Sequence, residues 1–288
     1  MSMEHLLYLG TLIAVWVIVA LAANLVIGYT GMMAMGQAAY LGVGAYVTAT
    51  LNILLGVNFY FALLLGAVAS ALAAAITLLP LRRIGGFYFA LATLGVNFVF
   101  FDIFHNLAPR VEGSEGLYGL QLPGLFASSG PRFAATLAIA VLCVLLCQRV
   151  VASPLGRALR ATRDRPDALA ALGKDPRRYQ MVVWTFAGAL TGLAGGLYAA
   201  TLFYIDPTLF TLDASILILV YIGVGGLAST AGSVLGVILL IAFNESLRFI
   251  GLPSQFVGPL QQAMYGLLLI GLMIFRRRGL MGEYDFRE

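Results

Sequence analysis

Residues 5–81 contain no Asp, Glu, Lys or Arg, which makes 77 consecutive positions without a charged side chain. A helix that crosses a lipid bilayer needs about 20 predominantly apolar residues. A charge-free stretch of this length therefore has to cross a membrane several times, and its turn residues divide it into three predicted spans. The whole chain fits this class, because only 10% of its 288 residues are charged, whereas soluble domains carry about 25%.

The apolar segments predict an all-α polytopic membrane protein of about nine spans, with eight or ten as alternatives. Two stretches, 30–50 and 222–234, are so dense in Gly and Ala that either could be a broken or re-entrant helix. Parts of them also resemble each other weakly, as in a transporter built from repeated halves, although any two Gly-rich hairpins look alike. The nine predicted spans are 6–28, 32–51, 59–79, 87–106, 133–151, 180–203, 210–227, 231–249 and 256–275.

One charged island, Arg149 to Arg178, lies between apolar segments and holds eight of the 17 Lys and Arg residues. Basic loops are retained on the cytoplasmic side of a membrane. With the island in the cytoplasm and nine alternating spans, 14 of the 17 basic residues fall on that side. This topology places the loop 107–132 and the N-terminus outside, and the C-terminus in the cytoplasm.

The island contains signals for two short helices. Ser153 followed by Pro154 predicts the first start, with Ser as the N-cap and Pro at the first helical position. Asp164 predicts the start of the second helix, and Gly173 predicts its end. The first helix carries a basic stripe, formed by Arg157, Arg160 and Arg163.

The second helix, of about two turns, is too short to be stable alone in water. It needs support from the chain's own cytoplasmic ends or from a partner. Its apolar surface, Ala168, Leu169 and Leu172, favours a helix that docks on a partner over a solvated topological anchor.

Ionisable residues are sparse within the predicted spans, and such residues usually mark ion or proton pathways. Asp102 and His105, near the outer end of the fourth span, could line a pathway or satisfy each other at the interface. Hydrogen bonds between helices are the alternative role for the neutral polar residues. The candidate pathway residues are Asn24, Gln37, Asn97 and Asp102. The pattern lacks the midplane carboxylates of a proton-coupled transporter and the polar cluster of a membrane enzyme.

The stretch SPLGRALRATRDRPDALAALGKDPRRYQMVVWTFAGALTGLAGGLYA, residues 153–199, resembles the LivM-type permease subunits of branched-chain amino acid ABC importers. The segments 24–49, 221–240 and 111–120 are similar to further blocks of the same family, and they occur in the same order. Gln37 departs from the family pattern, because many relatives have His there. The substitution keeps a polar group but removes a titratable one.

The resemblance implies a single transmembrane permease domain, 1–288, with a cytoplasmic coupling loop at 152–178. The coupling helix would dock on an ATP-binding subunit through Asp167, Ala168, Leu169, Ala170, Ala171, Leu172 and Gly173. The implied partners are two ATP-binding subunits, a second LivH-like permease subunit and an extracytoplasmic solute-binding protein, assembled in a bacterial inner membrane.

This chain has no Gly-x-x-x-x-Gly-Lys-Ser/Thr motif, so ATP and Mg are expected on the partner subunits, with no cofactor here and no enzymatic activity. Nucleic acid is not an expected partner, because the basic residues lie in loops that flank the membrane. The alternative is a stand-alone secondary transporter or facilitator for a small neutral or zwitterionic solute.

Overall fold

The computed structural model describes residues 3–111, 116–248, 260–261, 263–267, 271 and 279–282. Most of the predicted ninth span and the C-terminal basic residues lie outside them. The helical elements are α1 (Met3–Asn24), the π-helical turn η1 (Leu25–Tyr29), α2 (Gln37–Leu55), α3 (Phe59–Leu81), α4 (Gly86–Val111), α5 (Gly124–Ala127), α6 (Ser129–Ala152), α7 (Pro154–Asp164), α8 (Pro166–Ala171), α9 (Pro176–Leu202), the 3-10 turn η2 (Pro207–Phe210), α10 (Leu212–Gly225) and α11 (Thr230–Arg248). Strands β1 (Leu117–Tyr118) and β2 (Tyr204–Ile205) pair antiparallel.

The chain is a multi-pass membrane protein, but nine spans are not confirmed. In the described residues, six helices are long and apolar enough to cross a membrane: α1 continued by η1, α2, α3, α4, α6 and α9. Helices α10 and α11 form a pair bent by 116°, which adds at most one broken or re-entrant span. With 14 residues, α10 is about 21 Å long, too short for a hydrocarbon core of about 30 Å.

Helices α2, α3 and α9 form the closest-packed part of the bundle, because glycines let their backbones touch. A Cβ atom on Gly44 of α2 would lie 2.1 Å from the carbonyl oxygen of Gly192 in α9. One on Gly195 would lie 2.0 Å from the carbonyl oxygen of Leu41. The Ser70 hydroxyl of α3 donates to the Tyr40 carbonyl of α2 at 2.8 Å. No larger residue fits at these two glycines without separating the helices.

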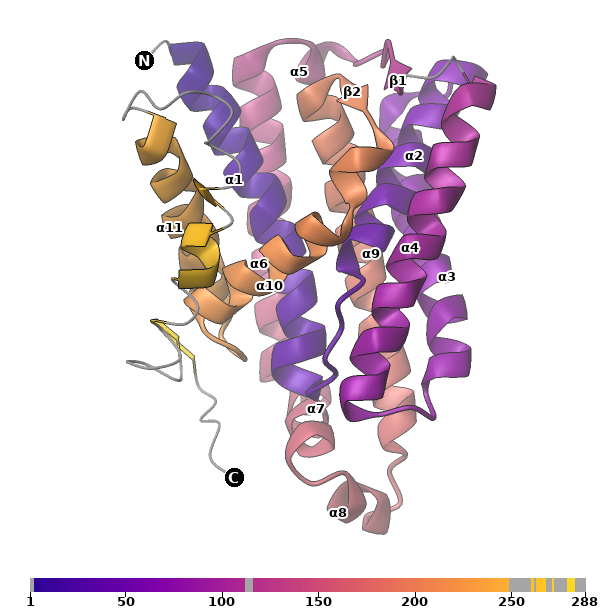
Figure 1. Ribbon diagram of the computed structural model, residues 1–288, viewed down its shortest axis with the longest axis vertical. Coiled ribbons are helices and arrows are strands. Elements are labelled where there is room, and N and C mark those ends of the chain that lie inside the picture. The colour runs from indigo at the N-terminus through magenta and orange to yellow at the C-terminus, as the bar shows by residue number, and fades with distance from the viewer. Residues whose placement is uncertain are drawn as a thin grey trace.

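The two ends of the bundle differ in their contents (Figure 1). The start of α1 and the strand pair lie at one end, and α7 and α8 lie at the other. The turn between α3 and α4, which contains Arg82 and Arg83, lies at the α7–α8 end. The structure therefore places this basic turn at the same end as the charged island, as the predicted topology requires.

The prediction of a broken helix within 30–50 is confirmed. After η1 the chain runs without helix through 31–36, and α2 begins about halfway up the bundle (Figure 1). The predicted span start at residue 32 is wrong by five residues. Gly31 adopts a left-handed backbone, with φ of +72°, which ends the helix. At Gly36 a Cβ atom would lie 2.2 Å from the Thr93 carbonyl oxygen, so only glycine lets this segment pass α4.

The second Gly-rich stretch is also broken, as predicted. Gly226 ends α10 with φ of +113°, a conformation that L-residues with side chains avoid. Its backbone lies against the segment 279–282, whose Leu280 and Met281 amides donate to the Val224 and Gly225 carbonyls. The chain after α11 therefore returns to the end of α10.

Candidate functional site

The charged island folds into α7 and α8, as its capping signals predicted. The Ser153 hydroxyl accepts a hydrogen bond from the Leu155 amide at 3.2 Å, and Pro154 is the first residue of α7. Gly173, the residue after the C-cap Leu172, stops α8 with a left-handed φ of +74°. The Gly173 amide donates to the Ala170 carbonyl and the Lys174 amide to the Leu169 carbonyl, the paired bonds of a Schellman motif.

Two details of the predicted island are wrong. Asp164 does not cap α8, because it is the last residue of α7 and its carboxylate pairs with the Arg163 guanidinium at 2.9 Å. Arg165 occupies the N-cap position, without a side-chain cap. Leu169 does not belong to an exposed docking face, because it is only 4% exposed and α8 leans on its own chain there.

The exposed apolar tip of α8 is Leu172, whose exposed fraction is 76%. Ala168 and Ala171 are also exposed, as are the remaining predicted docking residues, Asp167, Ala170 and Gly173. A large apolar side chain at the end of a solvated helix is a feature that a partner can cover. Figure 1 shows α8 as the outermost element at this end of the bundle.

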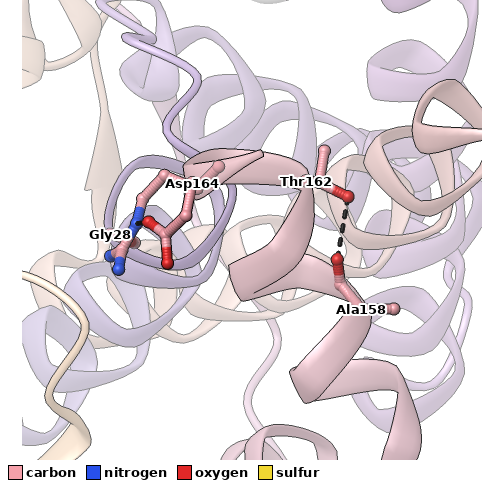
Figure 2. Close-up of polar contacts among 5 residues, drawn as sticks. Gly28, Ala158, Thr162 and Asp164 are labelled. Carbon is pink, nitrogen blue, oxygen red and sulfur yellow. Dashed lines mark hydrogen bonds and ion pairs between the residues drawn. The ribbon is translucent and has the colours of Figure 1, made fainter. Parts of the chain in front are cut away.

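Helix α7 connects α8 to the first helix break. Arg163 of α7 donates through Nη1 to the Gly28 carbonyl oxygen at 2.5 Å, a contact across 135 positions of sequence. Figure 2 shows Gly28 beside Asp164 at the end of α7. The Arg160 guanidinium lies 5.6 Å from the Tyr29 ring centroid, within cation–π range. Two cations of the predicted basic stripe thus contact the C-terminal end of η1, where unpaired carbonyls attract positive charge.

A cleft of about 430 Å³ opens beside this contact. Its walls come from η1, the 31–33 segment, α7 and the adjoining ends of α3, α4 and α9. Arg82, Arg163 and Gln180 give it a polar rim, and Phe89 of α4 lies on its wall.

Asn24 connects the two helix breaks to each other. Its Oδ1 accepts from the Ala228 amide at 2.9 Å, and its Nδ2 donates to the Ser229 carbonyl and the Ser233 hydroxyl at 2.8 and 2.7 Å. Both ends of the amide are therefore occupied by the α10–α11 junction. This candidate pathway residue joins two helix breaks, and the two weakly similar stretches pack against each other here.

The other neutral candidates, Gln37 and Asn97, lie on two helices that are linked through Ser215 in the middle of the bundle. The Ala38 amide, at the start of α2, donates to the Ser215 hydroxyl of α10 at 3.1 Å. That hydroxyl donates in turn to Asn97 Oδ1 of α4 at 3.4 Å. Gln37, the first residue of α2, is buried next to Ala38. The Thr93 hydroxyl, one turn from Asn97, accepts from the Met35 amide at 3.0 Å.

Aromatic side chains close this polar cluster on both sides. Towards the α7 end, Phe89 packs against Trp184, with ring centroids 5.5 Å apart, and Trp184 packs against Tyr40 at 5.8 Å. Towards the opposite end, Phe104 stacks on Tyr46 at 4.7 Å and lies 6.1 Å from Phe210. The Phe89, Asn97 and Phe104 positions share the inward face of α4, where all three are buried.

Asp102 does not join the cluster, because it lies on the exposed side of α4. Asp206 lies near the Phe104–Tyr46 pair, and it accepts from the Tyr204 hydroxyl and the Thr208 amide, both at 2.6 Å. Partial burial opposes its ionisation, but these hydrogen bonds outweigh that effect and hold the pKa of Asp206 below its ordinary value. The bond to Asp206 raises the pKa of Tyr204.

Sequence reasoning missed Ser215, Thr93 and the Arg163–Gly28 contact. Single Ser and Thr residues in apolar helices carry no distinctive signal, because their usual role is a bond to a carbonyl of their own helix. One indication in the sequence placed Ser215 near the start of a helix, because it follows the break marked by Asp206 and Pro207.

Known proteins resemble the chain over most of its length. LivM, the high-affinity branched-chain amino acid transport system permease protein of Escherichia coli (strain K12), is 28% identical over 95% of this chain and 69% of its own. A probable LivM from Methanocaldococcus jannaschii is 24% identical over 92% of this chain and 90% of its own. A probable LivH from the same organism is 27% identical over 88% and 84%. No solved structure is significantly similar.

A family model also matches most of the chain. The sequence profile described as "Branched-chain amino acid transport system / permease component" matches residues 5–275. This range contains the capped island, both Gly-rich breaks and the buried polar cluster. The chain therefore belongs to the family of branched-chain amino acid transport system permease components, and it is a transport subunit.

Proposed function

We propose that the chain is a transmembrane subunit of an ATP-driven, binding-protein-dependent importer for branched-chain and related hydrophobic amino acids. The observation that carries the proposal is the continuous contact from α8 through α7 to the first helix break. An exposed capped helix with an apolar tip is suited to receive force from a partner. Arg163 joins the same unit to Gly28, so a displacement of α8 reaches the first helix break.

The proposed assembly follows from the two ends of the bundle. The end with α7 and α8 faces the cytoplasm of a bacterial cell, together with the C-terminus, because basic loops are retained there. Two partner subunits bind ATP and Mg and hydrolyse the ATP, while this chain holds no cofactor. A second, LivH-like permease subunit completes the membrane part, and an extracytoplasmic solute-binding protein meets the opposite end. The chain is one permease domain, with residues 152–178 as its coupling loop.

The proposed mechanism uses the two helix breaks as the moving parts. When the partner pulls α8, α7 moves with it, and Arg163 and Arg160 transmit the displacement to η1. Asn24 passes it to the α10–α11 junction through three hydrogen bonds. The aromatic groups at Phe89 and Phe104 then separate in turn. Gln37 and Asn97 line the path between them, and Asp102 lies beside it on the exposed side of α4.

ATP-driven uptake in reconstituted vesicles tests this proposal. The importer, purified with the subunits that accompany it, should take up labelled leucine when ATP lies on the α8 side and no ion gradient is present. A matched preparation with a non-hydrolysable ATP analogue should not. Uptake by this chain alone, driven by a proton gradient and indifferent to ATP, would instead establish a secondary transporter.

Thiol labelling tests the proposed orientation. Cys143 and Cys147 are buried and unpaired, so both are first replaced by Ala. Ser128→Cys and Lys174→Cys then introduce thiols at exposed positions near opposite ends of the bundle. In whole spheroplasts an impermeant reagent should label the first variant and not the second. The reverse pattern would invert the proposed topology.

A further inference from the structure

We propose that the amide of Asn97, together with the first turns of α2 and α10, forms the site that holds the carboxylate of the amino acid during its passage. The inference rests on the proposed import function and assigns a chemical role to the middle of the path. It concerns one group of the substrate, an anionic carboxylate, and the donors that face it.

The first observation is that two helices begin at the same place. Ala38, in the first turn of α2, and Ser215, in the first turns of α10, are joined by a hydrogen bond of 3.1 Å. Neither helix has a side-chain cap, since Gly36 has no side chain and Thr211 makes no cap bond. The positive ends of two helix dipoles therefore converge about halfway along the bundle. Broken helices direct their N-termini at anionic substrate groups in other transporters.

The second observation is independent of the helix ends. Asn97 is 1% exposed, and its Nδ2 has no hydrogen-bond partner in the described part of the chain. The Ser215 hydroxyl accepts from the Ala38 amide and donates to Asn97 Oδ1. The NH₂ group is therefore the end of the Asn97 amide that is left without a partner among the described residues. A buried donor without an acceptor is costly, and an incoming carboxylate would supply the acceptor.

The surroundings fit the rest of a hydrophobic amino acid. Along α4, Phe89 lies about 12 Å below Asn97 and Phe104 lies about 10 Å above it, at 1.5 Å per residue. Aromatic side chains border the cluster at both levels. No Lys, Arg, Asp or Glu lies among the described residues of the cluster. A site of neutral donors binds a carboxylate weakly enough to release it, whereas a full positive charge would retain it.

The chemical group is tested with Gln37→Cys, which leaves the Asn97 amide in place, in the background without Cys143 and Cys147, using the assembled importer in nanodiscs. A small cationic thiol reagent should reach the introduced thiol while ATP is being hydrolysed. Millimolar leucine and isovalerate, which share the carboxylate, should each slow labelling at least threefold, and isoamylamine, which lacks it, should not. Protection by the amine as strong as by the acid would overturn the proposal, and so would a thiol that stays unreactive in every nucleotide state.

A second variant tests the electrostatics through transport. Asn97→Asp places an anion opposite the carboxylate, so the number of leucine molecules imported per ATP hydrolysed should fall at least tenfold. The matched control is Asn244→Asp, because Asn244 of α11 also has a buried amide oxygen without a partner in the described residues but lies outside the cluster. Its ratio should stay within twofold of wild type. Equal losses in the two variants, or none in Asn97→Asp, would contradict the carboxylate site.

These results separate the two levels of inference. If the wild-type importer takes up no amino acid with ATP, the proposed function is wrong, whatever the variants do. If the wild-type importer and the Asn97→Asp variant both take up amino acid equally well, only the proposal of a carboxylate site is wrong.

Discussion

The bundle has two regions that differ in how continuous their helices are. In the α2–α3–α9 trio, backbones touch through Gly44, Gly192 and Gly195. Around η1, the 31–36 segment and the α10–α11 junction, Gly36 and Gly225 also approach neighbouring backbone. The helices there are interrupted, however, and their ends are joined by a few hydrogen bonds that involve Asn24, Ser215 and Arg163. Close packing cannot be shifted without losing many contacts at once, whereas one hydrogen bond contributes only about 0.5–1.5 kcal/mol net. The trio is therefore suited to be a rigid frame, and the broken region to move against it.

The largest expected effect comes from inserting a side chain into the frame. Gly44→Val should prevent folding, because its Cβ would sit 2.1 Å from the Gly192 carbonyl oxygen. Overpacking of this kind costs about 1–3 kcal/mol and often more. We expect at least a tenfold loss of protease-resistant protein in membranes. Gly95→Val is the matched control, because nothing lies within 4 Å of the Cβ position at Gly95. Normal yield of the Gly44 variant would mean that the trio is not a rigid frame.

The next effect concerns the exposed tip of α8. Leu172→Asp should leave insertion and folding unchanged, because Leu172 is 76% exposed, but it should weaken association with the ATP-binding subunit at least tenfold and abolish uptake. Co-purification of the subunits and labelled leucine uptake are the two measurements. Leu169→Asp is the contrasting variant, since a charge at this buried position should instead lower the yield. Wild-type transport by the Leu172 variant would show that partners dock elsewhere.

A smaller effect is expected at the link between α7 and η1. Arg163→Ala removes a charged hydrogen bond to Gly28, worth about 1.5–3 kcal/mol, so uptake per ATP hydrolysed should fall about tenfold while the subunits still assemble. Arg157→Ala is the control on the same helix, with the same charge change at an exposed position. If both variants lower the ratio equally, net charge on α7 matters and the Gly28 contact does not.

The smallest effect is expected at Asp102, which is exposed on α4 and belongs to neither region. Asp102→Asn should reduce the rate of uptake less than threefold, and uptake should still require ATP. The measurement is uptake at fixed ATP with and without an imposed proton gradient. If wild-type uptake responds to the proton gradient and Asp102→Asn abolishes transport, Asp102 is a coupling carboxylate.

Much of the local structure could be predicted from the residues alone. The Ser153–Pro154 helix start, the Gly173 stop and the breaks in the two Gly-rich stretches all depend on backbone conformations that neighbouring residues determine. The count of nine spans is not confirmed, because hydropathy does not show that α10 and α11 form a pair bent by 116° and most of the predicted ninth span lies outside the described residues. Length along the membrane normal is a tertiary property.

The candidate site divides along the same line. Gln37 and Asn97 could be named from the sequence because polar residues stand out in apolar spans, and the structure brings both to the start of α2. Asn24 stood out for the same reason, but its amide joins the two helix breaks. Leu169 was predicted to lie on the exposed docking face, but it is buried. The sequence of a six-residue helix shows which residues are apolar but does not show which side packs on the rest of the chain.

The sequence by itself determined that this chain crosses a membrane many times, where its helices break, and which loop is basic, capped and exposed. These properties depend on composition and on residues close together in the chain. Only the tertiary structure decided that Arg163 meets Gly28 across 135 positions, that two helix N-termini converge on Asn97, and which residue of α8 faces outward. Such contacts depend on which helices pack against each other. The hydrophobic periodicity of one helix does not indicate which other helix it contacts.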